Sequence, residues 1–195
     1  MEILLIVVVL TLVGGSVLLA VEGTTRLRTL YDQGGEVHWD RLAAAVQLMH
    51  GHSERGQHLL EGRRDGVWMH VEADGSWMIV RGRLDVRMPS GFLVRRWKTL
   101  SQRASLRTGS PLLDSTLHIS GEPASAQLLR SPALVAPMMS VVHAWPGSFV
   151  DERHVVLRYP DALGRRLDER CQEVVELVLA LRGAQQHARL LERDR

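Results

Sequence analysis

The fold is decided by the stretch from Gly66 to Arg83, which reads GVWMHVEADGSWMIVRGR. Apolar and polar residues alternate on both sides of Asp74-Gly75, a dipeptide whose tolerance of positive φ suits a type I′ turn. This pattern predicts a β-hairpin. Trp68, His70 and Glu72 alternate with apolar residues along the first strand, so we expect that strand to be buried on one face only.

Further elements are predicted on the C-terminal side of this hairpin. Alternation indicates a strand from Leu84 to Met88, and the run FLVRRWK after Pro89-Ser90-Gly91 indicates another. Ser131-Pro132 is typical of a helix start, because serine caps a helix and proline suits its first turn. The remaining expectations are a strand from Leu113 to Ser120, a helical patch from Gly121 to Leu129, a helix from Ser131 to about His143, and a closing hairpin of Phe149-Val150 with His154 to Tyr159.

Helices are predicted at both ends of this region. Trp39 to His50 has apolar residues at helical spacing and Gly51 as a stop, while residues 52–64 read as loop or frayed helix. From Asp161 to Leu181 an apolar residue recurs every three or four positions, which predicts a long amphipathic helix. The polar tail 184–195 either continues it or frays. Together these elements predict one α+β domain over residues 39–183, with an antiparallel sheet and helices on one of its faces.

The N-terminus is predicted to be a membrane anchor, residues 1–22, joined by a linker over residues 23–38. Ile3 to Val21 carries no charge, and as a helix it spans about 28 Å, the thickness of the hydrocarbon core. A cleaved signal peptide is the alternative, but it usually has a basic start and a shorter apolar run. Arg26 and Arg28 follow the run, so the positive-inside rule places the domain in the cytoplasm, with the periplasm as the alternative.

Composition excludes several classes of protein. The chain has 195 residues, 24% of them charged, with a formal net charge of only +2. Such shallow basicity does not indicate nucleic-acid binding. Cys171 is the sole cysteine, so neither an internal disulfide nor a four-cysteine zinc cage can form.

The stretch TGSPLLDSTLHISGEPASAQLLRSPALVAPMMSVV, Thr108 to Val142, resembles the core of an uncharacterised family of single-pass bacterial membrane proteins. That family tends to show Thr-Gly-Asp, two residues and Phe-Asp before a strand, and the resemblance extends over about residues 39–159. Thr108, Gly109 and Asp114 match the motif, whereas Ser110 and Leu113 depart from it. The resemblance implies an architecture only, and no activity.

Three histidines, His50, His52 and His58, are close in sequence, and neutral imidazoles are common zinc or copper ligands. On the predicted helix His50 and His52 face different ways, so we expect a solvated helix end, with metal binding as the alternative. No metal and no cofactor are therefore predicted.

Catalytic motifs are weak in this sequence. There is no G-x-S-x-G elbow and no P-loop. Asp114 and His118 fall on one side of the predicted strand from Leu113 to Ser120 and have residue types that act as acid and base, but a structural pair is the simpler interpretation. An enzyme with a site assembled from scattered residues remains the alternative.

The basic stretch after the hairpin is the main candidate for a binding surface. Beside a bilayer, such charges interact with anionic headgroups, while a solvated sheet face and nucleic-acid binding are the alternatives. We expect a membrane-anchored, non-catalytic module that contacts anionic lipid or a protein partner. The candidate contact residues are Arg81, Arg83, Arg87, Arg95, Arg96, Lys98, Arg103 and Arg107.

Overall fold

The computed structural model describes residues 35–96, 106–161 and 163–193. The predicted anchor from Ile3 to Val21 lies outside these ranges, and so do Arg26 and Arg28. Within them, no helix has both the length and the apolar character that a bilayer crossing requires. The chain divides into two units, residues 1–41 and 42–195. Residues 35–41 of the first unit are helical.

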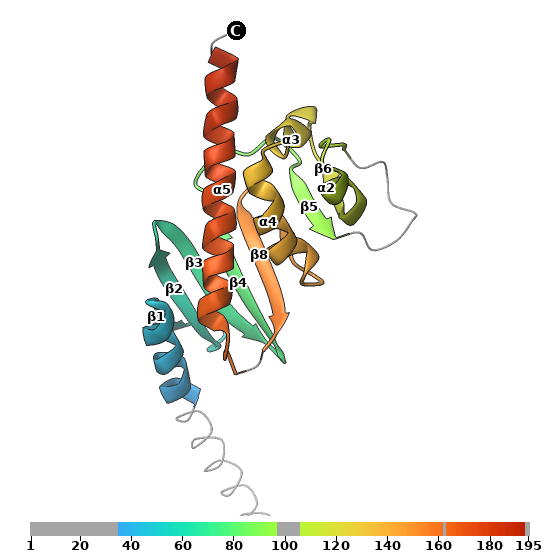
Figure 1. The fold of residues 1–195 in the computed structure, drawn as a ribbon. Helices are drawn as coiled ribbons and strands as arrows, with labels where there is room; N and C mark the ends of the chain where they lie inside the picture. The colour runs from blue at the N-terminus through green and yellow to red at the C-terminus, as the bar shows by residue number, and fades with distance from the viewer. Residues whose placement is uncertain (1–34, 97–105, 162, 194–195) are drawn as a thin grey trace, which may run out of the picture. The chain divides into compact units, whose positions relative to one another are not determined.

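The second unit is an α+β domain with an antiparallel sheet and a long C-terminal helix, as predicted, and the sheet has eight strands (Figure 1). It begins with helical residues 42–46. The strand order across the sheet is β1-β2-β3-β4-β8-β7-β5-β6. The strands are β1 (Met49–His52), β2 (His58–Arg64), β3 (Val67–Asp74), β4 (Trp77–Arg83), β5 (Leu93–Arg96), β6 (Leu117–Ser120), β7 (Phe149–Val150) and β8 (His154–Pro160).

The predicted hairpin from Gly66 to Arg83 is confirmed as β3 and β4, with Asp74 paired to Trp77. In its loop only Gly75 has a positive φ, +61°, whereas a type I′ turn needs two such residues. The preceding turn between β2 and β3 has them, because Asp65 and Gly66 have φ of 49° and 76°. The prediction of a type I′ turn at Asp74-Gly75 was therefore wrong, and the first Asp-Gly pair fits that pattern.

Several helical segments follow β5 in the chain. They are α2 (Pro111–Thr116), α3 (Pro123–Leu128), the 3₁₀ turn η1 (Pro132–Leu134), α4 (Val135–Met138), the π-helical turn η2 (Met139–His143) and α5 (Leu167–Arg193). The helix from Ser131 to His143 is thus confirmed as three short segments. The C-terminal helix starts at Leu167 rather than Asp161, and it runs through the predicted tail to Arg193.

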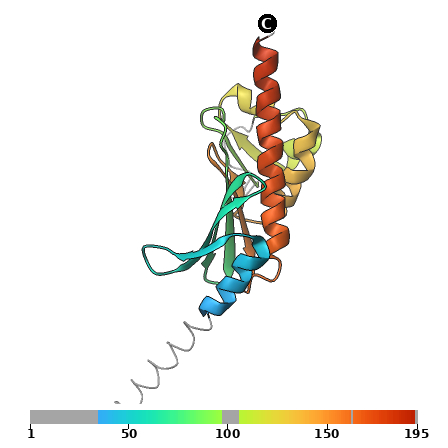
Figure 2. The same ribbon diagram turned by 90° about the vertical axis from the view of Figure 1, so that its left-hand side faces the viewer.

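The core lies between the sheet and α5, which contacts β3, β4 and β8. Figure 2 shows α5 lying along one side of the sheet. Leu60, Val71, Val80 and Leu157 stand opposite one another across β2, β3, β4 and β8, and all are fully buried. Burial of such a row stabilises the fold by roughly 25 cal/mol for each Å² of apolar surface. At Gly82 a Cβ would lie 2.6 Å from Val174 Cγ1, so the missing side chain lets α5 approach β4.

Two predictions about the start of the domain were wrong. The first helix ends at residue 46, because Gln47 takes a positive φ of 60° and the Leu48 N–H donates to the Ala43 carbonyl. The segment 52–64 is mainly strand, since residue 52 ends β1 and residues 58–64 form β2, and only residues 53–57 are loop. Its polar character reflects an exposed hairpin tip and one solvent-facing side of β2.

Two further strand predictions were wrong in part or in full. Residues 84–88 form no strand; the Leu84 N–H donates to the Arg153 carbonyl, and the chain then leaves the sheet. Leu113 to Thr116 belongs to helix α2, because Pro111 favours a helical first turn and Leu113 and Leu117 are spaced by four. Only Leu117 to Ser120 is strand β6.

Candidate functional site

The face of the sheet opposite the buried row carries an open groove of about 520 Å³. Its side chains come from β2, β3, β4, β8 and the loops beside them, and they alternate along each strand with core residues. The sequence therefore positions them through the same period of two that builds the core. The lining residues are Glu61, Trp68, His70, Arg81, Arg83, Leu84, Arg153 and His154.

A row of charged side chains crosses the groove floor from β2 to β4. Glu61, His70 and Arg81 stand opposite one another in the strand register. His70 Nδ1 lies 2.7 Å from Glu61 Oε1, and His70 Nε2 lies 3.2 Å from Glu72 Oε2. Arg81 Nη2 donates to Glu72 Oε1 at 2.7 Å, and this bond lowers the pKa of Glu72 despite its burial. Glu72 therefore stays ionised near neutral pH, and its negative charge holds Arg81 in place.

Two further side chains of the groove, Trp68 and Arg153, lie outside this hydrogen-bonded row. Trp68 is 39% exposed, which is high for a large aromatic side chain. The Arg153 guanidinium forms no ion pair with any residue in the described part of the chain. A neighbouring hollow shares Leu84 and Arg153 and continues toward Gln185 and Arg189 of α5. An exposed aromatic beside an uncompensated cation suits an acidic ligand with some apolar surface.

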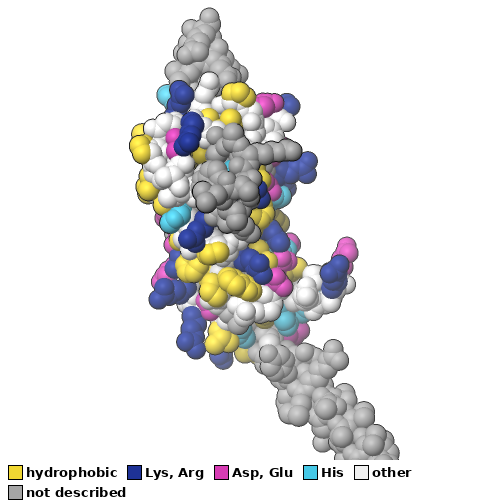
Figure 3. Space-filling model, turned by 90° about the vertical axis from the view of Figure 1, so that its right-hand side faces the viewer, with side chains coloured by type: hydrophobic (Ala, Val, Ile, Leu, Met, Phe, Trp, Pro, Cys, Tyr) yellow, Lys and Arg dark blue, Asp and Glu magenta, His cyan; other side chains and the backbone are white. Residues whose placement is uncertain are grey.

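The structure distributes the predicted basic residues over several surfaces. Arg81 and Arg83 converge in the groove, and Arg83 Nε lies 3.5 Å from Asp85. Arg87 lines the neighbouring hollow, while Arg95 and Arg96 on β5 line another with Arg158. Lys98 and Arg103 lie outside the described residues, and Arg107 precedes α2. Figure 3 shows basic side chains interspersed with acidic and apolar ones on the face that it presents.

The three histidines of the first hairpin are brought together. His50 and His52 lie on β1 and His58 on β2, with His52 directly opposite His58. The expectation that His50 and His52 face different ways was wrong, because it assumed a helix, and residues two apart on a strand face the same way.

Asp114 and His118 do not share a strand, since Asp114 lies on α2 and His118 on β6. Asp114 Oδ1 accepts hydrogen bonds from the Thr108 N–H at 2.8 Å and from the Thr108 hydroxyl at 2.9 Å. Its Oδ2 accepts from the Gly109 N–H at 3.2 Å, and Gly109 has φ +84°. Thr108, Gly109 and Asp114 thus form one structural turn closed by a carboxylate.

Burial raises the pKa of Asp114, but the hydrogen bonds from Thr108 and Gly109 outweigh it and leave the pKa below its ordinary value. We expect Asp114→Asn to lower the free energy of unfolding by about 2 kcal/mol in urea denaturation at pH 7, since the acceptor loses its charge and an amide nitrogen replaces one of its two accepting oxygens. Because the folded-state pKa is the lower one, this stability is present above the unfolded pKa and is lost as the pH falls through the folded value. The deficit should therefore shrink in acid.

The matched control for this prediction is Asp168→Asn. Asp168 is 62% exposed at its side chain and pairs at 2.7 Å with Arg64, whose own side chain is 15% exposed. Such pairs contribute less than about 1 kcal/mol, so this variant should stay close to the parent chain. Equal losses from both variants would show that the Thr108 turn is not specially stabilised.

The single cysteine is not a nucleophile at neutral pH. Cys171 lies on α5 and is fully buried. Burial raises the pKa of its thiol to about 12, so the thiolate is scarce. Cys171 therefore acts as a core residue.

Comparison of the chain with family models, curated proteins and solved structures finds no match. The resemblance of Thr108 to Val142 to a family of bacterial membrane proteins stays a prediction.

Sequence reasoning missed most of the groove. It placed Trp68, His70 and Glu72 on the outer face of one strand, which is where they lie. It did not connect them with Arg153, which reaches the groove through the pairing of β4 with β8. The available signal was the second polar cluster, Asp151-Glu152-Arg153-His154, at a hairpin turn.

Proposed function

We propose that this chain is a membrane-anchored, non-catalytic binding module whose open groove takes an acidic segment of a protein partner. The observation that carries the proposal is the presence of Arg81, Arg83 and Arg153 with the exposed Trp68 in one hollow. Arginine and tryptophan are the residues that most often dominate binding energy in protein interfaces.

A protein segment fits the groove better than a lipid surface does. The groove is a concave hollow, and a planar bilayer does not enter it, whereas an extended chain does. The uncompensated Arg153 would pair with a carboxylate of the segment, and Trp68 would cover its apolar part. Anionic lipid is therefore the competing outcome of the test.

A non-catalytic role is supported by the state of the polar groups in the groove. His70 is held by Glu61 and Glu72, and Glu72 is held in turn by Arg81. The charged groups of this row are thus bonded to one another, and Cys171 lies buried outside the groove. The alternative is an enzyme in which His70, oriented by its two carboxylates, transfers protons.

The anchor and the cytoplasmic placement remain part of the proposal. They depend on the uncharged run from Ile3 to Val21 and on Arg26 and Arg28 after it. In a bacterial host, the full chain should sediment with the membrane fraction and should need detergent for release.

Photo-crosslinking in cells tests the groove. A benzophenone amino acid in place of Trp68 should crosslink to a protein through an acidic segment, whereas the same substitution at Leu163, which is 53% exposed, should not. With the purified partner, Arg153→Glu should weaken binding at least tenfold, and Arg165→Glu, at an exposed arginine outside the groove, should leave it unchanged. Crosslinks to lipid alone, or equal effects of both arginine variants, would contradict the proposal.

A further inference from the structure

We propose that His50, His52 and His58 form a binding site for a divalent transition-metal ion of the zinc class. One ligand nitrogen from each histidine lies within 4.8 Å of the others. The ring centroids are 5.2 Å apart for His50 and His52, 5.1 Å for His50 and His58, and 4.8 Å for His52 and His58. Three imidazoles therefore surround one point.

The spacing is close to what a zinc ion requires. With Zn–N bonds of about 2.0–2.1 Å, tetrahedral ligand nitrogens are separated by about 3.3 Å. His50 Nε2 and His58 Nδ1 are 2.9 Å apart and share a hydrogen bond. An ion would replace the shared proton and move these two nitrogens apart slightly, while His52 would turn inward. Only side-chain rotations are needed, since the strands already place the rings together.

The backbone of the first hairpin fixes this arrangement. His52 and His58 are paired across the strands and flank a five-residue tip. Within the tip, the Ser53 N–H donates to the Gln57 carbonyl at 2.8 Å, and the Ser53 hydroxyl oxygen accepts from the Gln57 N–H at 3.1 Å. Gly56 supplies the positive φ of 73° that the tip needs. A preorganised hairpin lowers the entropic cost of binding an ion.

The nature of the donors selects the class of ion. The site offers three imidazole nitrogens and, among the described residues, no thiolate or carboxylate joins the cluster. Imidazole donors suit zinc, copper and nickel, whereas calcium and magnesium require oxygen ligands. Three protein ligands leave one tetrahedral position for water.

The site is accessible and separate from the groove. β1 is the edge strand of the sheet, and His52 is exposed while His50 and His58 are half-buried. Figure 2 shows the β1–β2 hairpin projecting from the sheet. His58 and Glu61 are three residues apart on β2, so they face opposite sides of the strand. A bound ion would join β1 to β2 and stabilise this edge without entering the groove.

Zinc titration of the full chain tests the site. The protein is purified in detergent without a histidine tag, stripped with a chelator and titrated with Zn²⁺ by calorimetry. We expect one Zn²⁺ per chain at micromolar concentration, at least tenfold weaker binding in His52→Gln, and loss of binding in the double variant His50→Gln/His58→Gln. The matched control is His187→Gln, at an exposed histidine of α5, which should bind as the parent does.

Two further measurements keep the test independent of folding. Circular dichroism should show the same secondary structure in all variants, because exposed or half-buried side chains are replaced. His52→Cys should restore binding, since thiolate is also a zinc ligand, and Co²⁺ should then show a thiolate charge-transfer band. Binding that is unchanged in the double variant, or weakened equally by His187→Gln, would overturn the proposal, as would saturation only at millimolar Zn²⁺.

Discussion

Gly82→Val should lower the free energy of unfolding by about 3 kcal/mol, the upper end of the usual cost of overpacking a core. A Cβ at this position would lie 2.6 Å from Val174 Cγ1 and 2.9 Å from Val178 Cγ2, far inside contact distance. Both valines are buried on α5 and cannot swing away as the end of a flexible chain would. Valine favours strands over glycine by up to about 1 kcal/mol, so the clash exceeds the gain in propensity.

Urea denaturation measures this loss, and two variants show its cause. Gly183→Ala, at a glycine within α5 that has nothing within 4 Å of the added Cβ, should be neutral or stabilising by up to about 1 kcal/mol. Gly82→Ala combined with Val174→Ala should cost less than the sum of the two single losses, because each change makes room for the other. Additive losses would mean that α5 and β4 do not meet at Gly82.

Local patterns predicted the elements whose determinants are close in sequence. The hairpin of β3 and β4 has its turn and its alternation within one short stretch, and the closing hairpin of β7 and β8 is equally local. Ser131-Pro132 likewise marks a helix start. In these places the conformational propensity of the residues, the spacing of the apolar side chains and the turn or cap residues all favour the same element, which is the condition for a reliable prediction.

Patterns failed where a tertiary contact decides the conformation. The sequence from Met49 to Arg64 lacks a strong apolar alternation, and it becomes strand because β3 provides a partner for β2. The first helix ends before Gln47 through that residue's positive φ, and no glycine stands at that position to indicate it in the sequence. Leu113 and Leu117 satisfied both a strand and a helix pattern, and only the first-turn position of Pro111 separates the two. Pairings such as β4 with β8 and β5 with β7 depend on contacts that a single sequence does not display.

The same difference applies to the candidate sites. The basic stretch was visible as composition, but the groove draws on β2, β3, β4 and β8, so its members became neighbours only through the sheet. The histidines were noticed as a group, yet the wrong secondary structure reversed their geometry. On a helix His50 and His52 diverge, whereas on β1 they converge with His58. An error in one local element thus changed the chemical conclusion.

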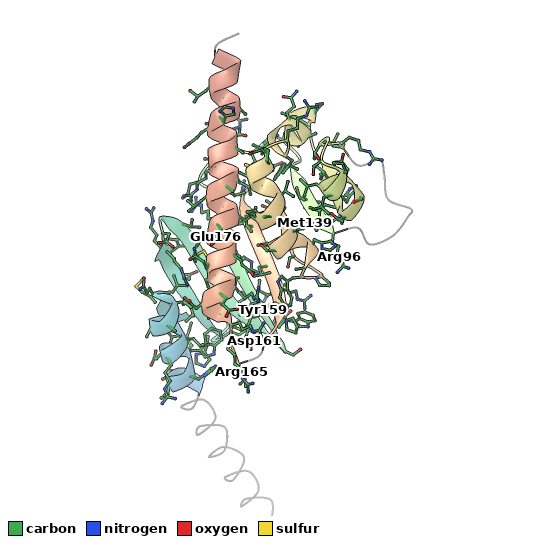
Figure 4. All side chains as sticks on the ribbon, in the orientation of Figure 1. Arg96, Met139, Tyr159, Asp161, Arg165 and Glu176 are labelled. Atoms are coloured by element: carbon green, nitrogen blue, oxygen red, sulfur yellow. The ribbon has the colours of Figure 1, made fainter. Side chains whose placement is uncertain are left out.

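The ion pair between Arg170 and Glu173 on α5 gives the second large prediction. Removing one of the two charges should destabilise the fold strongly, whereas removing both should have little effect. Arg170 is only 11% exposed at its side chain, and its Nη1 donates to Glu173 Oε1. Its guanidinium lies 4.9 Å from the centre of the Trp145 ring, and that ring meets Tyr159 edge-on. Figure 4 labels Tyr159 on β8 beside the first turns of α5, and burial raises the pKa of this tyrosine. The arginine therefore sits in a largely apolar setting.

Glu173→Gln should lower the free energy of unfolding by roughly 2–3 kcal/mol, somewhat below the 3–5 kcal/mol seen when a fully buried pair is broken. The remaining carboxylate, Glu169, lies 3.7 Å from Arg170 Nη2 and is 66% exposed, so it compensates only in part. The double variant Arg170→Met/Glu173→Leu should return to within about 1 kcal/mol of the parent, because removing both charges also removes their desolvation cost. Denaturation of the three chains at pH 7 decides the matter. If the double variant is destabilised at least as much as Glu173→Gln, packing of Arg170 on Trp145, rather than the charge pair, holds this end of α5 to the sheet.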